Sequence, residues 1–234
     1  MKRVLVPLAE GFEELEAVTI IDVLRRAGID VVVASLAGSP VTGSHGIRLA
    51  ADTPLAALAE QEFDMIALPG GMPGAEHLKK DARIAEIIRR LHGKGRPVAA
   101  ICAAPMVLAA AGVLDGRRAT SYPGFLDDAT RATVVDEAVV ADRGVITSRG
   151  PGTALDFALA LVAELAGPEA RATIEGAQVS NRMLQLMAAE QAARARAALD
   201  AQEAFAASQH RLDVLSGLRG HCSYPTHHHT LLSK

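Results

Sequence analysis

Cys102 is the residue of this sequence best placed to do chemistry. It follows the small apolar run 98–101 and precedes Ala103, Ala104 and Pro105. This order predicts a buried strand, a sharp turn and the first turn of a helix, because proline is accommodated at a helix start. A thiol at such a corner faces the N–H groups of a helix N-terminus, which favour the thiolate. The alternative is a cysteine that simply fills the core.

A cysteine nucleophile needs a base or a lowered pKa, donors for an oxyanion, and room for substrate. The N–H of Ala103, directly after the cysteine, and the N–H of Gly71, in a glycine-rich loop, are the candidate oxyanion donors. Glu16, near the start of the first expected helix, is the candidate acid–base partner. Burial and a neighbouring thiolate would raise the pKa of Glu16, so that its protonated form donates to the thiolate and moves protons.

Strands and helices alternate along most of the chain. Buried strands are expected at 4–8, 31–35, 63–68, 98–101, 118–121 and 145–148, and helices at 12–27, 82–91, 105–111 and 154–165. This alternation predicts an α/β fold with a mostly parallel sheet and helices on both faces. Active sites of such sheets form at the carboxyl ends of strands. We therefore expect the loops 11–16, 69–74 and 102–105 to converge.

Three finer features are expected within this framework. The first helix should bury a stripe of apolar side chains, namely Leu15, Val18, Ile21 and Leu24. Thr53-Pro54 should start a brief helix, and the runs 134–135 and 138–140 should form a hairpin around Asp136-Glu137. Glu13 and Glu14 are interpreted as complementing the dipole of the first helix.

Bulk composition excludes several classes of protein. The chain has 234 residues, half of them hydrophobic, and a net charge of −3, so there is no electrostatic case for a nucleic-acid or membrane partner. No apolar run is long enough to span a bilayer, and acidic residues arrive too early for a signal peptide. Two distant cysteines, Cys102 and Cys222, form no disulfide framework. We expect a cytoplasmic protein.

The chain is expected to divide into three parts. Residues 1–180 form the α/β domain, residues 181–216 an alanine-rich helical extension, and residues 217–234 a disordered tail. The tail contains soft metal ligands, namely His221, Cys222, His227, His228 and His229. Their spacing matches no known zinc motif, so no metal site is expected.

Four short segments carry a family resemblance. They are Glu-Glu-Leu-Glu-Ala-Val at 13–18, Leu-Pro-Gly-Gly at 68–71, Ala-Ala-Ile-Cys-Ala-Ala-Pro at 99–105, and Thr-Ser-Arg-Gly-Pro-Gly-Thr at 147–153. In this order and spacing the chain resembles the ThiJ/PfpI superfamily, in the branch around the Parkinson-associated protein DJ-one, over roughly residues 1–177. The resemblance implies a flavodoxin-like sandwich, a homodimer and no cofactor.

The same resemblance implies roles for single residues. Cys102 would be the oxidisable nucleophile, Glu16 its protonated partner, and Gly71 with Ala103 the oxyanion donors. Protease-type members carry a histidine directly after the nucleophile, where this chain has Ala103. The human-like branch carries a histidine at the position of Tyr122, where bacterial ThiJ-type members can have an aromatic residue.

These departures favour carbonyl or redox chemistry over proteolysis. We expect a small aldehyde or glycated substrate, handled by a cofactor-independent glyoxalase or deglycase. The alternative is a redox sensor or redox-regulated chaperone that uses oxidation of Cys102 without turnover. The remaining pocket candidates are Gly70, Tyr122, Arg26 and His45, with His45 approaching the pocket across a dimer. His77 and His92 are expected on the surface.

Overall fold

The computed structural model describes residues 1–58, 61–126 and 131–178, together with 190–191, 193–194, 196–197 and 199–200. Most of the extension expected at 181–216, and all of the tail expected at 217–234, lie outside these residues. Within the described part of the chain, no helix is both long enough and apolar enough to cross a bilayer.

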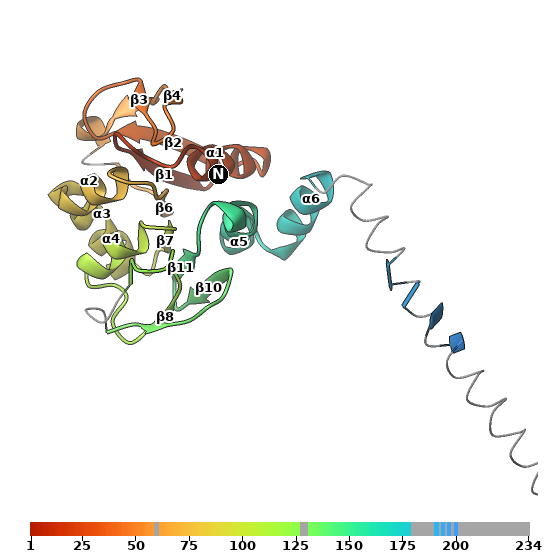
Figure 1. Cartoon of the computed structure of the whole chain (residues 1–234). Coiled ribbons are helices and arrows are strands. Elements are labelled where there is room, and N and C mark those ends of the chain that lie inside the picture. The colour runs from red at the N-terminus through yellow and green to blue at the C-terminus, as the bar shows by residue number, and fades with distance from the viewer. Residues whose placement is uncertain are drawn as a thin grey trace, which may run out of the picture. The chain divides into compact units, whose positions relative to one another are not determined.

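The centre of the domain is a seven-stranded sheet in the order β10-β11-β7-β6-β1-β2-β5 (Figure 1). Its strands are β1 (Arg3–Leu8), β2 (Asp30–Ser35), β5 (Thr53–Pro54), β6 (Met65–Leu68), β7 (Val98–Ile101), β10 (Val139–Asp142) and β11 (Val145–Ser148). Every neighbouring pair is parallel except the edge strand β10, which runs antiparallel to β11. The mostly parallel sheet expected from the sequence is confirmed.

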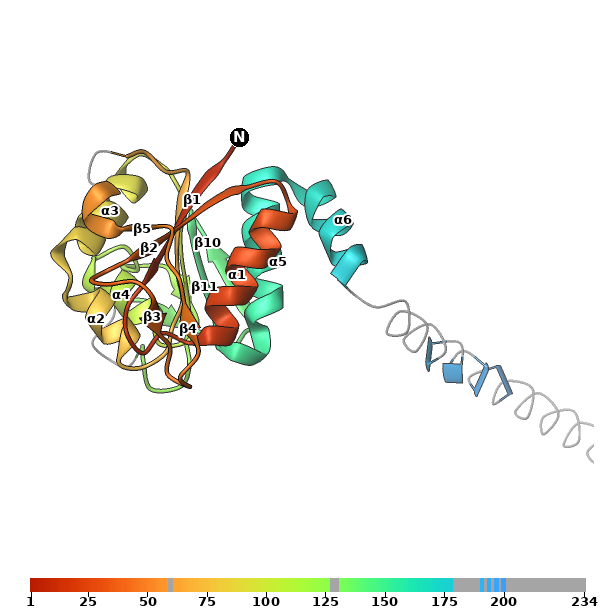
Figure 2. The same ribbon diagram turned by 90° about the horizontal axis from the view of Figure 1, so that it is seen from above.

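Helices cover both faces of this sheet (Figure 2). One face carries α1 (Glu14–Arg26) and α5 (Ala154–Ala166), with α6 (Pro168–Gln178) packed on α5. The other carries α2 (Gly74–Lys80), α3 (Ala82–Gly93) and α4 (Pro105–Ala110). The inner strands are buried on both sides, which explains their near-continuous apolar sequences.

Short elements complete the domain. β3 (Val41–Thr42) pairs with β4 (Arg48–Leu49), and β8 (Arg118–Ala119) pairs with β9 (Thr133–Val134). Single turns of 3-10 helix span Leu55–Leu58 and Pro151–Thr153. The brief helix expected to start at Thr53-Pro54 begins at Leu55 instead, because Thr53 and Pro54 form the strand β5, which pairs with β2.

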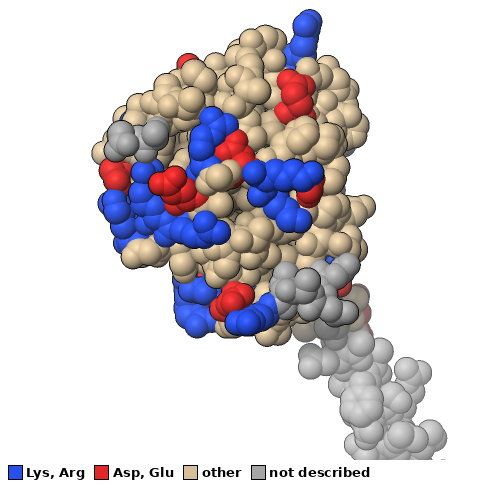
Figure 3. Space-filling model, turned by 90° about the vertical axis from the view of Figure 1, so that its left-hand side faces the viewer, with Lys and Arg blue, Asp and Glu red and all other residues tan. Residues whose placement is uncertain are grey.

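The surface around α2 and α3 carries both signs of charge side by side (Figure 3). Basic side chains there pair with acidic neighbours: Lys80 with Glu76, Arg83 with Asp81, and Lys94 with Glu62. The charges of this face are therefore largely compensated locally.

The buried face of α1 differs from the expected one. Leu15 and Val18 are 52% and 46% exposed, whereas Ile20 and Leu24 are completely buried, as is Glu16. Positions 16, 20, 23 and 24 lie on one side of a helix, so turning Glu16 inward brings Ile20 and Leu24 with it and leaves Leu15 and Val18 outside. Ile21 and Leu24 of the expected stripe are buried as predicted.

The expected hairpin around Asp136-Glu137 is wrong. β9 pairs in parallel with β8, and β10 instead forms a hairpin with β11 across Arg143-Gly144. Both turn residues have positive φ, 48° and 80°. Two such residues form the two-residue turn whose twist matches that of paired strands, and this selects β11 as the partner of β10.

The orientation of α1 predicts unequal costs for two truncations. Ile20→Ala should lower the free energy of unfolding by about 2–5 kcal/mol, because it leaves a cavity in the core. Val18→Ala should change it by about 0.5 kcal/mol or less. Urea unfolding, at a protein concentration where the midpoint no longer depends on concentration, measures both. Equal losses would contradict the assigned face.

Candidate active site

Cys102 lies at the carboxyl end of β7, immediately before α4. Its φ of 64° places it in the left-handed region, which an L-residue occupies only at a cost of about 1–2 kcal/mol. Its N–H donates to the Ser148 carbonyl (3.0 Å), and its carbonyl accepts from the N–H of Tyr122 (2.9 Å). The sharp turn is thus held at both backbone groups, and the side chain remains partly exposed.

Glu16 reaches the cysteine from the first turn of α1. Its Oε2 accepts a hydrogen bond from the N–H of Gly70 (2.8 Å), while Oε1 is buried and has no hydrogen-bond partner. A side chain at Gly70 would begin 2.7 Å from Cys102 Cβ and 2.9 Å from Glu16 Oε2. Only glycine therefore lets the loop after β6 approach both functional residues this closely.

The two side chains perturb each other's titration. Burial raises the pKa of Glu16 to about 7, against the lowering effect of the Gly70 N–H. Burial, followed by the charge of Glu16, raises the pKa of the Cys102 thiol to about 12. The N–H groups of Gly71 and Ala103 hydrogen-bond to the thiol and oppose this rise. Both expected oxyanion donors therefore face the sulfur.

The pKa of Cys102 corrects one expectation from the sequence. A helix N-terminus alone would favour the thiolate, but burial beside a carboxylate outweighs it. A carboxylate and a thiolate that lie side by side in a site with little water repel each other strongly. Near neutral pH the pair of Glu16 and Cys102 therefore carries at most one negative charge. Because Glu16 has the lower pKa of the two, it loses its proton first and Cys102 keeps its own.

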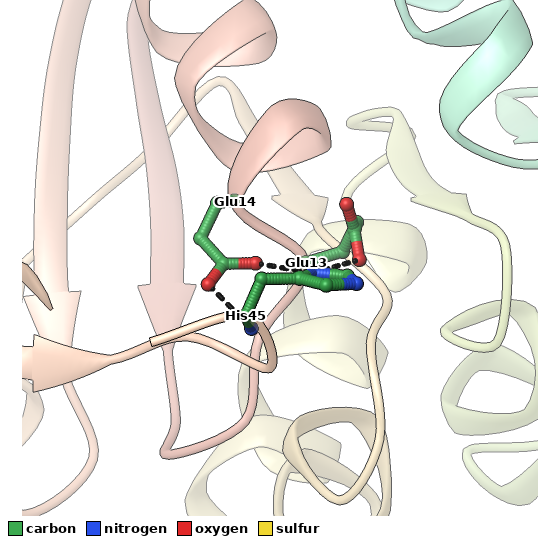
Figure 4. A group of neighbouring side chains, drawn as sticks. All are labelled: Glu13, Glu14 and His45. Atoms are coloured by element: carbon green, nitrogen blue, oxygen red, sulfur yellow. Dashed lines mark hydrogen bonds and ion pairs between the residues drawn. The ribbon is translucent and has the colours of Figure 1, made fainter. Parts of the chain in front are cut away.

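His45 lies beside Glu13 and Glu14 at the start of α1 (Figure 4). Its Nδ1 is 3.0 Å from Glu14 Oε2 and 3.5 Å from Glu13 Oε2, and its N–H donates to Glu14 Oε1 (2.7 Å). The N–H of Glu13 donates in turn to the carbonyl of Gly70. Within this chain His45 is therefore linked to Gly70 through Glu13, and its approach to the pocket across a dimer stays a prediction.

Glu14 plays a different part from the expected one. It is buried, and although burial opposes ionisation, hydrogen bonds from His45 and Ile47 lower its pKa to about 2. Its carboxylate anchors the loop between β3 and β4 rather than only complementing the dipole of α1. The hydrogen bond that the His45 ring donates to Glu14 raises the pKa of His45.

Glu13, Glu14 and His45 also have the donor types of a metal site, with ligand atoms within 4.8 Å of one another. These atoms are already engaged within the group, and Ser44 Oγ adds contacts of 3.2 Å to Glu13 and 3.3 Å to Glu14. We interpret the group as an ion-paired loop anchor. The histidines and cysteine of the tail lie outside the described residues.

Tyr122 adjoins the site, as expected, and Arg26 does not. The Tyr122 ring is half-exposed and lies against Gly150, where a Cβ would stand 3.2 Å from the ring. Arg26 is ten residues beyond Glu16 on α1, about 15 Å along the helix, and its guanidinium pairs with Asp22 (2.6 Å). Within this chain Arg26 is no part of the pocket, because α1 points it toward the opposite end of the sheet.

The two other histidines of the domain lie away from Cys102. His77 is exposed, with Nδ1 3.2 Å from the carbonyl of Glu10. His92 is half-buried, with Nε2 3.0 Å from the guanidinium of Arg117.

The segment 147–153 brings further residues to this region, namely Ser148, Arg149 and Thr153. The sequence points to the segment as a whole but does not single out these three residues. With Tyr122 and Gly150, Arg149 and Thr153 line a cleft of about 490 Å³.

Comparison with known proteins agrees with this architecture. A model of the DJ-1/PfpI family matches residues 2–164, and the chain belongs to this family. It is 45% identical to DJ-1 homolog A of Arabidopsis thaliana over 172 residues, which are 72% of this chain and 44% of that protein. The chain thus spans less than half the length of that relative.

Two further proteins resemble the chain over most of their own length. A deglycase of Pyrococcus abyssi is 40% identical over 152 residues, covering 64% of this chain and 91% of that protein. The structure of oxidised DJ-1 from Toxoplasma gondii superposes with a TM-score of 0.74 at 39% identity, covering 77% of this chain and all of the other. The fold of the domain is therefore that of DJ-1 proteins.

The raised pKa of Glu16 predicts how Glu16→Gln alters stability with pH. The folded state disfavours the charged carboxylate, so wild-type stability falls as pH rises from 4.5 through about 7. The glutamine variant lacks this loss, and should gain about 3 kcal/mol relative to wild type between pH 4.5 and 8. Urea unfolding at several pH values measures the difference. A difference that does not depend on pH would contradict the raised pKa.

Proposed function

We propose that the protein uses Cys102 to convert small reactive carbonyls without a cofactor, as a glyoxalase or a related deglycase. Methylglyoxal would yield lactate, and glyoxal would yield glycolate. The observation that carries the proposal is the buried Glu16 carboxyl beside Cys102, with two N–H donors at the sulfur. The deglycase of Pyrococcus abyssi supports the same class of chemistry.

The geometry suggests how the two groups divide the work. Glu16 takes the thiol proton as the Cys102 sulfur attacks the aldehyde carbon, forming a C–S bond and a hemithioacetal. The N–H groups of Gly71 and Ala103 stabilise the oxyanion before it is protonated. With a carboxyl pKa of about 7, Glu16 is suited both to accept and to return a proton near neutral pH.

The following steps need no external oxidant. Glu16 removes the proton from the former aldehyde carbon, and an enediol forms. Protonation of the neighbouring carbon then gives a thioester, so one carbon is oxidised while the other is reduced. Water attacks the thioester, the C–S bond breaks, and lactate leaves with regeneration of the thiol. Atoms and electrons balance within the substrate and one water molecule.

The mechanism predicts that Cys102→Ala abolishes lactate formation from methylglyoxal, and that Glu16→Gln lowers kcat about 10²–10⁴-fold. The wild-type rate should rise with pH through about 7, as Glu16 becomes a base. Enzymatic detection of lactate measures all three. The exposed residue His77 offers a control, since His77→Ala should retain activity. Persistent lactate formation by Cys102→Ala would refute the proposal.

A redox sensor is the second candidate, and the partial exposure of Cys102 favours it. Peroxide would transfer one oxygen to the thiolate, and a second peroxide would give the sulfinate. Protonated Glu16 and the N–H of Ala103 are placed to donate hydrogen bonds to the new oxygens.

Mass spectrometry after mild peroxide treatment tests this alternative. We expect two added oxygens on Cys102 in the wild type, and faster loss of the thiol in Glu16→Gln, because removing the charge of Glu16 favours the thiolate. Cys102→Ala is the control, since it should gain no oxygen at that position. Equal oxidation of Cys102 and the methionines would contradict selective sensing.

We also propose that the protein is a cytoplasmic homodimer. The exposed Leu15 and Val18 on α1, with Ile47 59% exposed, form apolar surface that supports self-association. Light scattering after gel filtration measures the mass in solution, and a monomer mass at all concentrations would contradict the dimer.

A further inference from the structure

We propose that Thr153 is a positioning residue for the Cys102 thiol, acting through a clamp built from residues 148–153 and Tyr122. The clamp holds both backbone polar groups of Cys102. This inference rests on the reactive-thiol role proposed above, and concerns how the fold keeps that thiol in place.

The first arm of the clamp is Ser148, the last residue of β11. Its carbonyl accepts the N–H of Cys102 (3.0 Å). Its buried hydroxyl donates to the carbonyl of Ala138 (2.7 Å) and lies 2.7 Å from Thr153 Oγ1. Because the hydrogen of Ser148 is used toward Ala138, the single hydroxyl hydrogen of Thr153 is shared between Ser148 Oγ (2.7 Å) and the Gly150 carbonyl (3.0 Å).

The second arm runs from Thr153 back to Cys102. Thr153 Oγ1 accepts from the N–H of Gly150 (3.2 Å), and the N–H of Thr153 donates to the Gly150 carbonyl (2.9 Å). Gly150 in turn lies directly against the Tyr122 ring. The N–H of Tyr122 donates to the Cys102 carbonyl (2.9 Å), so this series of contacts connects Thr153 to Cys102.

The second arm matters because of peptide planarity. The carbonyl of Cys102 and the N–H of Ala103 belong to one rigid peptide unit. Holding the carbonyl through Tyr122 therefore sets the direction of the Ala103 N–H, which hydrogen-bonds to the sulfur. Cys102 also sits at a φ of 64°, a conformation that persists only where its surroundings impose it.

Removing the Thr153 hydroxyl should loosen this peptide without touching the thiol. The Ala103 N–H would then stabilise the thiolate less well. We expect slower reaction of Cys102 with alkylating reagents and an upward shift in the pH profile of that reaction. A purely structural threonine would change only the unfolding free energy.

The test measures alkylation of Cys102 by iodoacetamide from pH 6 to 10, with unfolding followed in parallel. Thr153→Val should react about tenfold more slowly at pH 7, which corresponds to a thiol pKa that is higher by about one pH unit. Thr153→Ser keeps a hydroxyl and should restore the wild-type profile. Wild-type reactivity in Thr153→Val, or failure of Thr153→Ser to restore it, would overturn the proposal.

Thr147 offers a matched control on the same strand. It is buried, and its hydroxyl accepts from the N–H of Thr120 (2.9 Å), outside the clamp. Thr147→Val should lose stability but keep the alkylation profile of the wild type. An equal loss of reactivity in Thr147→Val and Thr153→Val would show a general structural effect and overturn the proposal.

A second variant covers the case in which Thr153→Val does not fold. Gly150 has an extended φ of 165°, which any residue adopts, so Gly150→Ala disturbs only the contact with Tyr122. It should shift the alkylation profile in the same direction, and an unchanged profile would overturn the clamp. Alkylation needs no turnover, so a wild type that alkylates as described but forms no lactate would refute the proposed activity and leave the clamp standing.

Discussion

A buried carboxyl beside a partly buried thiol is the constraint on which the rest of the structure depends. Glu16 is completely buried next to Cys102, and both groups cannot be charged at neutral pH. The cost of burying Glu16 is only partly offset, because Oε2 accepts a hydrogen bond from the Gly70 N–H whereas Oε1 has no hydrogen-bond partner. A retained proton explains how such a group is tolerated, and gives it a role in moving protons at Cys102.

Much of the local architecture follows from bringing these two groups together. Turning Glu16 inward sets the rotation of α1, which leaves Leu15 and Val18 on its outer side. Glycine at 70 is required because the loop after β6 lies against both Glu16 and Cys102. The parallel sheet supplies the common edge, since β1, β6 and β7 are neighbours and their carboxyl ends adjoin.

The sequence predicts the framework well and the side-chain geometry less well. Continuous apolar runs predict buried strands such as 98–101, and the small residues on both sides of Cys102 indicate a site at which a substrate can approach. The buried face of α1 was harder to predict, because the helix has two overlapping apolar stripes, one through Leu15 and Val18 and one through Ile20. The inward position of Glu16 selects the stripe through Ile20. Within this chain Arg26 lies at the far end of α1 from Glu16, and charge alone does not reveal which end of a helix meets the site. The contacts of Glu14 with His45, and of Ser148 with Thr153, depend on loop conformations that no periodicity encodes.

The most direct test of this account is the protonation of Glu16 itself. Carbon NMR of the Glu16 carboxyl, titrated in the wild type and assigned by comparison with Glu16→Gln, reports its charge directly. The account predicts a midpoint near 7, raised from the ordinary value of 4.5. A midpoint near 4.5 would show a fully ionised carboxylate beside Cys102 at neutral pH, and would contradict the raised pKa of Glu16 on which the proposed chemistry rests.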